Sequence, residues 1–252
     1  MKLSVVTVSY NAQATIRETI RSVAALGDTI FEYVVIDGAS TDATLSILDE
    51  EAPSLDGRLR VFSERDNGIY DAMNKGIDRV DGEWVLFLGA DDVLLPGAAA
   101  FAEHAPSHGV DMVCADVEVV DARGAVRVDT CRTPRLIGHL PREMPNCHQG
   151  MTISTEAYRA LGGFNTLFRI AADYELFIRF AKAGYRWEHL DALVSRFALG
   201  GTSSARWLPT AREYREARVR HGLSPLASYL AFGMSFANSM AARGLSRVDR
   251  SR

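Results

Sequence analysis

The stretch Trp84-Val-Leu-Phe-Leu-Gly-Ala-Asp-Asp-Val-Leu-Leu95 decides the fold class of this chain. It opens with an unbroken apolar run, which is typical of a strand buried on both faces. Gly89 and Ala90 end the run with small side chains that let a ligand approach the backbone. The carboxylates of Asp91 and Asp92 follow, where α/β proteins usually bind ligands, and their oxygens suit Mg²⁺ or Mn²⁺. The alternative is that this acid pair only caps the next helix.

Strand and helix patterns alternate through residues 1–98. Short apolar or β-branched runs, each followed by helical spacing, predict an α/β fold with a Rossmann-like, mostly parallel sheet and helices on both faces. The polar residues after the strands are then expected at one edge of the sheet, where ligands bind. The expected strands are Leu3–Ser9, Tyr33–Ile36, Leu59–Phe62 and Trp84–Leu88, and the expected helices are Thr15–Leu26, Asp42–Glu50 and Ile69–Val80.

The pattern changes after residue 98, and we expect residues 99–204 to form a second, acceptor-binding half of one catalytic domain. Val110–Val120 and Ala125–Val128 flank a turn and predict a hairpin. Residues 136–149 show no periodicity and are expected to form a functional or mobile loop. Helices are expected from Ser154 or Thr155 to Leu161 and over Asp173–Ala183, and a strand over Leu193–Phe197.

The composition bounds the class of protein. The 252 residues are 47% hydrophobic and 24% charged, which is ordinary for a globular domain. Three cysteines without metal-site spacing indicate a reducing cytoplasm, and a strand pattern that starts almost at once leads us to expect no signal peptide. Neither a Gly-x-Gly-x-x-Gly loop nor a Walker-type phosphate loop is present.

Five groups of residues stand in an order that is found in a known family. They are Val5–Asn11, Val35–Asp42, Asp66–Gly76, Gly82–Asp92, and His148-Gln149 with Gly162–Phe164 and Ala172–Leu176. This pattern resembles glycosyltransferase family 2, whose members have the GT-A fold, over about residues 3–204. The closer resemblance is to bacterial enzymes that build cell-surface polysaccharides or glycolipids. It implies a nucleotide-sugar donor, a divalent metal and inversion at the anomeric carbon, and we expect no nucleic-acid partner.

The resemblance assigns roles to the residues that follow the strands. Asp91 stands at the last position of the family's Asp-x-Asp motif and would be the metal ligand, with Asp92 beside it at the donor site. Gly89 replaces the first acid of that motif, so one metal or ribose contact is lost. Asp37 would hydrogen-bond the nucleoside, and Gly38 stands where many relatives carry a second acid that reads the base. The identity of the base therefore stays open.

Four further residues are assigned to the nucleotide sugar. Tyr10 sits where an aromatic ring would flank the base, or it is a surface-loop tyrosine. Asp66 would touch the nucleoside through its loop. Lys75 would face phosphate, although a solvated helix lysine is the simpler interpretation. His148 would contact the donor phosphate or the acceptor, or it is a structural histidine.

Asp173 matches the position of the family's catalytic base. Inversion needs one carboxylate that takes the proton of the acceptor hydroxyl while its oxygen attacks opposite the leaving phosphate. The alternative is an acid that only stabilises the first turn of its helix through the helix dipole. The two roles are compatible, because a helix N-terminus holds a carboxylate in place.

Two other classes of function are open. A nucleotidyltransferase, which makes the sugar nucleotide, shares the architecture and the use of a metal, but the loop Ser9–Gln13 lacks the basic residues that would bind a triphosphate. A non-catalytic glycan- or nucleotide-binding module would share the fold without the chemistry. Release of nucleoside diphosphate from a panel of sugar nucleotides, with and without Mn²⁺, separates these classes.

Residues 205–252 are expected to form a basic, amphipathic helical tail. Residues 206–252 carry nine arginines against three acidic residues, and Leu223–Ala242 has no charge. An apolar helix between arginines suits peripheral docking on the anionic inner face of the cell membrane, where a lipid-linked or glycolipid acceptor would lie. The alternative is a helix that packs on the catalytic domain or on a second subunit in a homodimer.

Binding to vesicles tests the membrane interpretation. We expect the full-length protein to sediment with vesicles that contain anionic lipid and not with neutral ones, because arginines are attracted to the anionic surface. High salt should release part of the protein, since salt screens these charges. If the full-length protein ignores anionic vesicles and removal of residues 223–252 unfolds the protein, the tail belongs to the core or to a protein interface.

Overall fold

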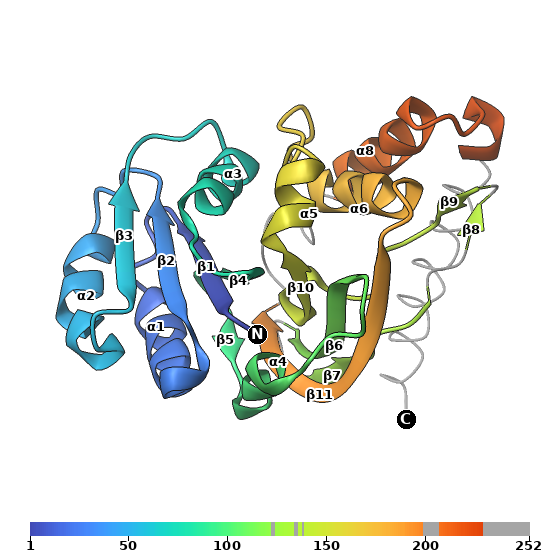
Figure 1. The fold of residues 1–252 in the computed structure, drawn as a ribbon. Helices are drawn as coiled ribbons and strands as arrows, with labels where there is room; N and C mark the ends of the chain where they lie inside the picture. Colours follow the sequence, from blue (N-terminus) through green and yellow to red (C-terminus); the bar gives the residue numbers. More distant parts are fainter. Residues whose placement is uncertain (122–123, 134–135, 138, 199–206, 229–252) are drawn as a thin grey trace, which may run out of the picture.

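The computed structural model describes residues 1–121, 124–133, 136–137, 139–198 and 207–228. Its described strands form one mixed sheet in the order β3-β2-β1-β4-β10-β6-β11-β5, with β7 paired to β6 and a separate β8-β9 pair (Figure 1). The strands are β1 (Leu3–Ser9), β2 (Glu32–Asp37), β3 (Leu59–Ser63), β4 (Trp84–Gly89), β5 (Val93–Leu94), β6 (Val110–Val120), β7 (Val126–Asp129), β8 (Leu136–Ile137), β9 (Leu140–Pro141), β10 (Met151–Ser154) and β11 (Arg186–Ala198). The helices are α1 (Ile16–Ala24), α2 (Thr44–Glu51), α3 (Ile69–Arg79), α4 (Ala99–Glu103), α5 (Thr155–Ala160), α6 (Ala172–Lys182) and α8 (Trp207–Arg220), and the 3₁₀ turns include η3 (Pro96–Ala98) and η4 (His148–Gly150).

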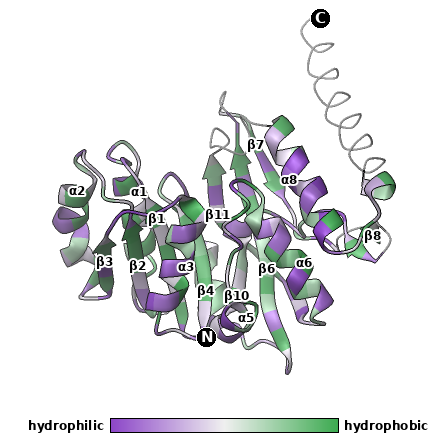
Figure 2. Cartoon of the chain, turned by 90° about the horizontal axis from the view of Figure 1, so that it is seen from above, coloured by the Kyte–Doolittle hydropathy of each residue, from purple (hydrophilic) through white to green (hydrophobic). Residues whose placement is uncertain are grey.

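The first half is a parallel sheet, as the sequence predicts. β1 pairs in parallel with β2 on one side and with β4 on the other, and β2 pairs in parallel with β3. Strand side chains alternate between the two faces, so Val5 packs in a core with Ile16 of α1, while Val6 packs in a core with Ile77 of α3. Figure 2 shows the hydrophobic residues along these central strands. Helices cover both faces, which confirms the expected α/β fold class.

The second half adds antiparallel pairing. β10 pairs antiparallel with β4 on one side and with β6 on the other. The expected hairpin is confirmed, since β6 and β7 pair antiparallel and Asp121 N donates to Ala125 O. β11 is longer than the expected strand Leu193–Phe197. Its first residues mix apolar with charged side chains and pair with β6 through register shifts, so they give no apolar run in the sequence.

Three local expectations need correction. α2 begins at Thr44 and not at Asp42, because the Asp42 carboxylate accepts hydrogen bonds from the backbone and the hydroxyl of Thr44 and so precedes the helix. The interval 136–149, expected to be a loop, contains β8, β9 and η4. The alternative that the acids after β4 cap the next helix is wrong. β5 follows these acids, and η3, all of whose residues the structure describes, has no side-chain cap. By contrast, α5 begins at Thr155, one of the two expected starts, and the Ser154 side chain caps it.

The expected tail begins with a helix that packs on the rest of the protein. α8 lies beside α6 (Figure 1), and Ala217 and Leu223 are buried in the same core as Phe177 of α6. Among the described residues, no helix is long and apolar enough to cross a membrane. Most of the expected amphipathic segment falls in residues 229–252, which lie outside the described residues, so the vesicle experiment still has to decide its role.

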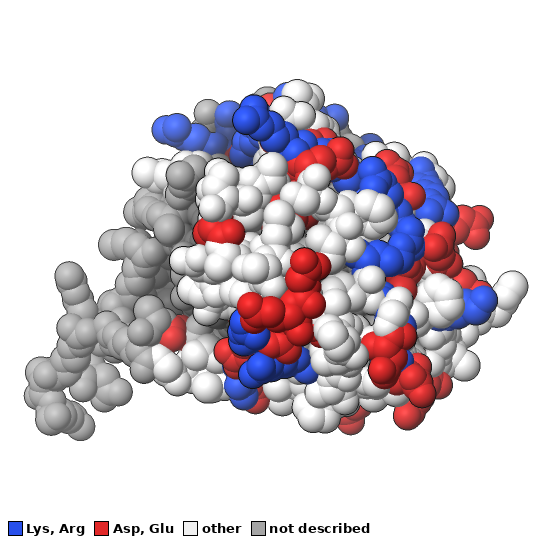
Figure 3. Space-filling view, turned by 90° about the vertical axis from the view of Figure 1, so that its left-hand side faces the viewer, with Lys and Arg blue, Asp and Glu red and all other residues white. Residues whose placement is uncertain are grey.

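The molecular face around α2 and β3 carries charges of both signs. Figure 3 shows basic and acidic side chains side by side on this face. Arg17 and Arg21 both pair with Glu51, and Arg60 pairs with Glu32. The first two pairs join α1 to the end of α2, and the third joins β3 to the start of β2.

Candidate active site

Asp91 and Asp92 have different surroundings at the end of β4. Asp91 is exposed, whereas Asp92 is only 1% exposed. The backbone N–H of Gly89 donates to Asp92 Oδ2 at 3.0 Å, and the N–H of Asp92 donates to the Gly89 carbonyl at 3.2 Å, so the residues close a tight turn. Asp91 is therefore the acid that a ligand can reach, and Asp92 holds the turn that presents it.

Gln149 joins this turn to the second half of the molecule. Its side-chain amide donates to Asp92 Oδ2 at 2.9 Å, and its backbone carbonyl accepts a hydrogen bond from the Ser195 hydroxyl, also at 2.9 Å. Both Gln149 and Asp92 are buried. The bond fixes η4, and with it His148, against β4 and β11. The sequence pattern contained Gln149, but gave no reason to assign it a role.

The donor set at the end of β4 fits a divalent cation bound together with substrate. A Cβ atom added to Gly89 would lie 2.6 Å from Asp92 Oδ2 and 2.9 Å from Asp91 Oδ1, so carboxylate oxygens fill the space that an acid at position 89 would need. No group of three or more metal-ligating side chains occurs among the described residues. Mg²⁺ is commonly held by one or two carboxylates plus substrate phosphates, and exposed Asp91 suits that arrangement.

Asp37 is buried and joins the ends of three parallel strands. Its carboxylate accepts hydrogen bonds from the Ser9 hydroxyl (3.1 Å), the Ser63 hydroxyl (2.7 Å), and both the backbone N–H (2.9 Å) and the hydroxyl of Ser40. These four bonds use about all the acceptor positions of a carboxylate. A direct bond from Asp37 to a nucleoside, as predicted, would require one of them to be exchanged.

Tyr10, Gly38 and Asp66 come together beside this strand end. Asp66 Oδ1 accepts the N–H of Gly68 at 2.8 Å, and Asp66 Oδ2 lies 2.5 Å from the position that a Cβ on Gly38 would take. Tyr10 Cδ2 lies 3.4 Å from the same position, and Tyr10 is 66% exposed. The structure thus places the side chains of Tyr10 and Asp66, both predicted to bind the nucleoside, around Gly38, which has no side chain.

Lys75 is held by its own surroundings. Its Nζ donates to the Arg65 carbonyl at 2.7 Å and lies 3.7 Å from a carboxylate oxygen of Glu64 and 3.8 Å from one of Asp71. Lys75 belongs to α3, and the contacts with Arg65 and Glu64 hold its ammonium group against the loop that carries Asp66. Its contact with phosphate remains a prediction.

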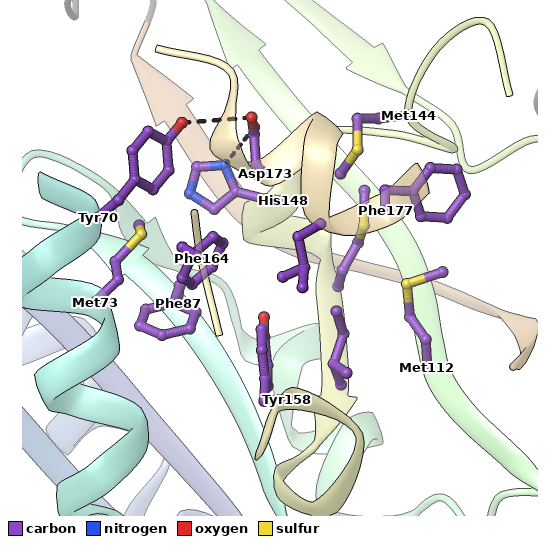
Figure 4. A pocket seen from close by; sticks show the side chains of 13 residues that line it. Tyr70, Met73, Phe87, Met112, Met144, His148, Tyr158, Phe164, Asp173 and Phe177 are labelled. Atoms are coloured by element: carbon purple, nitrogen blue, oxygen red, sulfur yellow. Dashed lines mark hydrogen bonds and ion pairs between the residues drawn. The ribbon is translucent and has the colours of Figure 1, made fainter. Parts of the chain in front are cut away.

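Asp173 lies in the first turn of α6 and faces His148 (Figure 4). Its Oδ1 accepts the backbone N–H of Tyr174 at 2.8 Å, and its Oδ2 lies 3.9 Å from His148 Nδ1. The Tyr70 hydroxyl lies 3.4 Å from Oδ1, but it has one proton and is closer to the Ile170 carbonyl, at 2.7 Å. The structure thus brings together His148 and Asp173, two predicted site residues from separate parts of the chain.

The surroundings of Asp173 favour proton transfer. Burial raises the pKa of the Asp173 carboxyl and lowers the pKa of His148. A carboxylate with a raised pKa accepts a proton more readily than an ordinary aspartate, and a lowered pKa keeps the imidazole neutral near pH 7. The first turn of a helix also stabilises the aspartate, so a structural role and a role as base are compatible.

Asp173 and His148 are among the residues that line an apolar cavity of about 30 Å³. The Tyr158 ring forms part of its wall, with the hydroxyl pointing into the space (Figure 4). A charge beside such a wall loses hydration, which disfavours the ionised forms of both groups. The methionines that line the cavity are Met73, Met112, Met144 and Met151.

The whole set of motifs matches one family. Residues 4–177 match the model described as Glycosyl transferase family 2. A PGL/p-HBAD biosynthesis glycosyltransferase of Mycobacterium tuberculosis is 34% identical over 213 residues, which cover 80% of this chain and 78% of the relative. The chain therefore belongs to glycosyl transferase family 2 and is a glycosyltransferase, which confirms the family that the motifs predicted.

Solved structures confirm the GT-A fold. TarS 1–349 of Staphylococcus aureus in complex with UDP-GlcNAc gives a TM-score of 0.63 at 21% identity, covering 92% of this chain and 70% of that one. A Pyrobaculum calidifontis mannosyltransferase in complex with GDP-Man and Mn²⁺ gives 0.65 at 19% identity, covering 100% of this chain and 76% of that one. The chain spans 41% of the longer TarS chain.

Changing Gln149 to Glu would set a second carboxylate against buried Asp92. We expect Gln149→Glu to lower the free energy of unfolding at pH 7.5 by at least ~1–3 kcal/mol, because the bond is lost and like charges repel. The pair raises the pKa of one acid in the folded state, so the deficit should shrink as the pH falls towards 5. Urea unfolding at both pH values measures it. Gln13→Glu, at the exposed position of the chain's other glutamine, is the control. A deficit that does not change with pH would contradict the pairing.

Proposed function

We propose that this glycosyltransferase transfers a sugar from a nucleotide-sugar donor to a hydroxyl group of its acceptor, with inversion at the anomeric carbon. The observation that carries the proposal is the position of Asp173. Its Oδ2 accepts no hydrogen bond from any described residue, faces His148, and belongs to a side chain that is 25% exposed. A carboxylate with a raised pKa and one unengaged, reachable oxygen is suited to take a proton.

A short chain of contacts connects this base to the end of β4. Asp91 precedes Asp92, Asp92 bonds to Gln149, and His148 precedes Gln149 and faces Asp173. Glycosyl transfer needs the diphosphate, the anomeric carbon and the acceptor hydroxyl to be held within a few ångströms. This continuity supports a diphosphate beside Asp91 and an acceptor hydroxyl beside Asp173.

The donor nucleoside would lie at the ends of β1 and β2. Tyr10 offers an exposed ring on which a base can stack, and the Asp66 carboxylate can accept a hydrogen bond from the base or ribose. Asp37 would keep the strand ends together beneath the nucleoside, and Lys75 would face the phosphates.

Asp91 would hold Mg²⁺ or Mn²⁺ together with the diphosphate oxygens of the donor. The cation would neutralise the charge that develops on the leaving nucleoside diphosphate. Asp92 keeps the turn closed and so keeps Asp91 directed to the donor.

The acceptor hydroxyl gives its proton to Asp173 Oδ2 as its oxygen bonds to the anomeric carbon. The bond from that carbon to the diphosphate oxygen breaks, and its electron pair leaves with the nucleoside diphosphate. Because bond formation and cleavage occur on opposite sides of the carbon, one displacement inverts the configuration. The Tyr174 N–H keeps Oδ1 engaged, which leaves Oδ2 to take the proton.

The names of relatives support an envelope glycan as the acceptor. The Mycobacterium tuberculosis relative is named for PGL/p-HBAD biosynthesis, and Staphylococcus aureus TarS, 32% identical over 130 residues, is named a poly(ribitol-phosphate) beta-N-acetylglucosaminyltransferase. We infer that the acceptor here is a polysaccharide precursor or a glycolipid of the cell envelope, met at the cytoplasmic face of the membrane.

Asp173→Asn removes the proton acceptor and keeps its shape. We expect release of nucleoside diphosphate from the preferred sugar nucleotide to fall ~10²–10⁴-fold, because general base catalysis is lost. Donor affinity measured by calorimetry should change little. Asp78→Asn, an exposed acid on α3, is the control. A large loss of donor affinity with unchanged turnover at saturation would give Asp173 a binding role instead.

Asp91→Ala tests the metal site. We expect turnover to fall ~100-fold or more, with the fold intact, because charge stabilisation by a bound metal is worth several kcal/mol. A Mn²⁺ titration should activate the wild type and the control Asp49→Ala, whose residue is exposed on α2, but not Asp91→Ala. Near wild-type turnover of Asp91→Ala without added metal would remove Asp91 from the metal site.

A further inference from the structure

The first turn of α6, which carries Asp173, is held by side chains of α8. The Tyr214 ring stacks on the Tyr174 ring, with centroids 4.1 Å apart and 5° between the planes. Arg218 Nε donates to the Tyr174 hydroxyl at 2.8 Å, and Arg218 is buried. α8 therefore fixes the residue that directly follows the proposed base.

Glu213 of α8 binds the backbone just before that turn. Its Oε2 accepts the N–H of Ile170 at 2.8 Å and of Ala171 at 2.9 Å, and both carboxylate oxygens lie 3.1 Å from the N of Arg169. N–H groups at a helix start lack partners inside the helix, and N-cap residue Ala171 supplies no side-chain bond. Glu213 thus holds the residues that lead into α6, and its charge is the one that a helix N-terminus favours.

The same three residues are held from the donor half as well. The Tyr70 hydroxyl donates to the Ile170 carbonyl at 2.7 Å, and the Arg169 guanidinium donates to the Asn67 carbonyl. The peptide groups at 169–171 are thus fixed by Glu213 on one side and by α3 and its preceding loop on the other. Asp173 follows two residues later, so a shift of this segment moves the base.

We propose that Glu213 is a positioning residue for the catalytic base, which it orients by fixing residues 169–171 so that Asp173 Oδ2 faces His148. The proposal rests on the proposed role of Asp173. It goes further, because it makes part of the tail expected after residue 204 a component of the catalytic machinery. A displacement of about 1 Å is enough to lower a rate ~100-fold.

Three variants on α8 test the proposal. Glu213→Ala removes every acceptor, Glu213→Gln keeps one carbonyl oxygen at the same side-chain length, and Glu216→Ala is the matched control. Glu216 lies on the same helix and pairs with Arg220 at an exposed position. The assay is release of nucleoside diphosphate, with Mn²⁺, from the sugar nucleotide that reacts fastest in a panel of UDP-, GDP- and dTDP-sugars.

We expect Glu213→Ala to lower kcat ~10–100-fold while the donor KM stays within about 3-fold, because the base is misplaced and the donor site is not. Glu213→Gln should recover part of kcat, and Glu216→Ala should match the wild type. Should Glu213→Ala not fold, Glu213→Asp replaces it under the same criteria, since its carboxylate is one methylene too short to reach the backbone. A kcat equal to that of Glu216→Ala overturns the proposal.

The pH dependence of kcat separates positioning from a purely structural role. Asp173 must be deprotonated to act, so kcat falls as the pH drops through its raised pKa. Once Glu213 is lost and water reaches the carboxyl, that pKa should fall towards its ordinary value, and the acid limb should move to lower pH. If Glu213 only stabilises the fold, its loss lowers Tm but leaves the acid limb of the pH profile of kcat unchanged. That result overturns the proposal.

The double variant Asp173→Asn/Glu213→Ala distinguishes the two proposals. If Glu213 acts through the base, the second change should add less than about 2-fold to the loss in Asp173→Asn, since coupled residues are not additive. If Asp173→Asn turns over like the wild type, the proposed function itself fails. If Asp173→Asn is impaired and Glu213→Ala behaves like Glu216→Ala, only the role of Glu213 fails.

Discussion

The buried hydrogen bond between Asp92 and Gln149 is the constraint on which the site depends. A carboxylate that is 1% exposed must be paired, because an unsatisfied buried charge is strongly destabilising. The bond pairs Asp92 and also spans the seam at β4, where the parallel half of the sheet meets the half with antiparallel strands. It sets the turn that exposes Asp91 and the turn η4 that directs His148 to Asp173. One interaction thus sets the position of the proposed metal ligand and of the neighbour of the proposed base.

The two proposed catalytic acids differ in their environments in the way their roles require. Asp91 is exposed to water at a strand end, where a carboxylate can meet a cation and the phosphates of a substrate. Asp173 lines an apolar cavity, and burial raises the pKa of its carboxyl group, which makes it a better proton acceptor. The two residues are both aspartates, and their different hydration suits them to different functions, as in other enzymes that use paired carboxylates.

The sequence predicted what depends on local pattern and missed what depends on distant contacts. The parallel strands, the acids at their ends and the helix of Asp173 follow from apolar runs and periodicity. The contrast between exposed Asp91 and buried Asp92 does not, because adjacent acids look alike until Gln149, 57 residues away, is brought to one of them. Tyr70 stood in the group Asp66–Gly76 without an assigned role, and Glu213 gave no signal, since their bonds to residues 169–171 join segments 42 to 100 residues apart. The catalytic domain was also predicted to end at residue 204, which left Glu213 outside the expected site.

Two glycines depart from the family pattern, and the same physical reason accounts for both. A Cβ on Gly38 would lie 2.5 Å from Asp66 Oδ2, and a Cβ on Gly89 would lie 2.6 Å from Asp92 Oδ2. In each case a carboxylate from another position already lies close to the point where a side chain at the glycine would begin. An additional acid at either glycine would bring two negative charges into contact, which disfavours the ionised form of both. Glycine at these positions therefore does not mean that the site lacks charge. We infer that Asp66 and Asp92 occupy these two spaces, and that exposed Asp91 is the acid that a ligand meets at the end of β4.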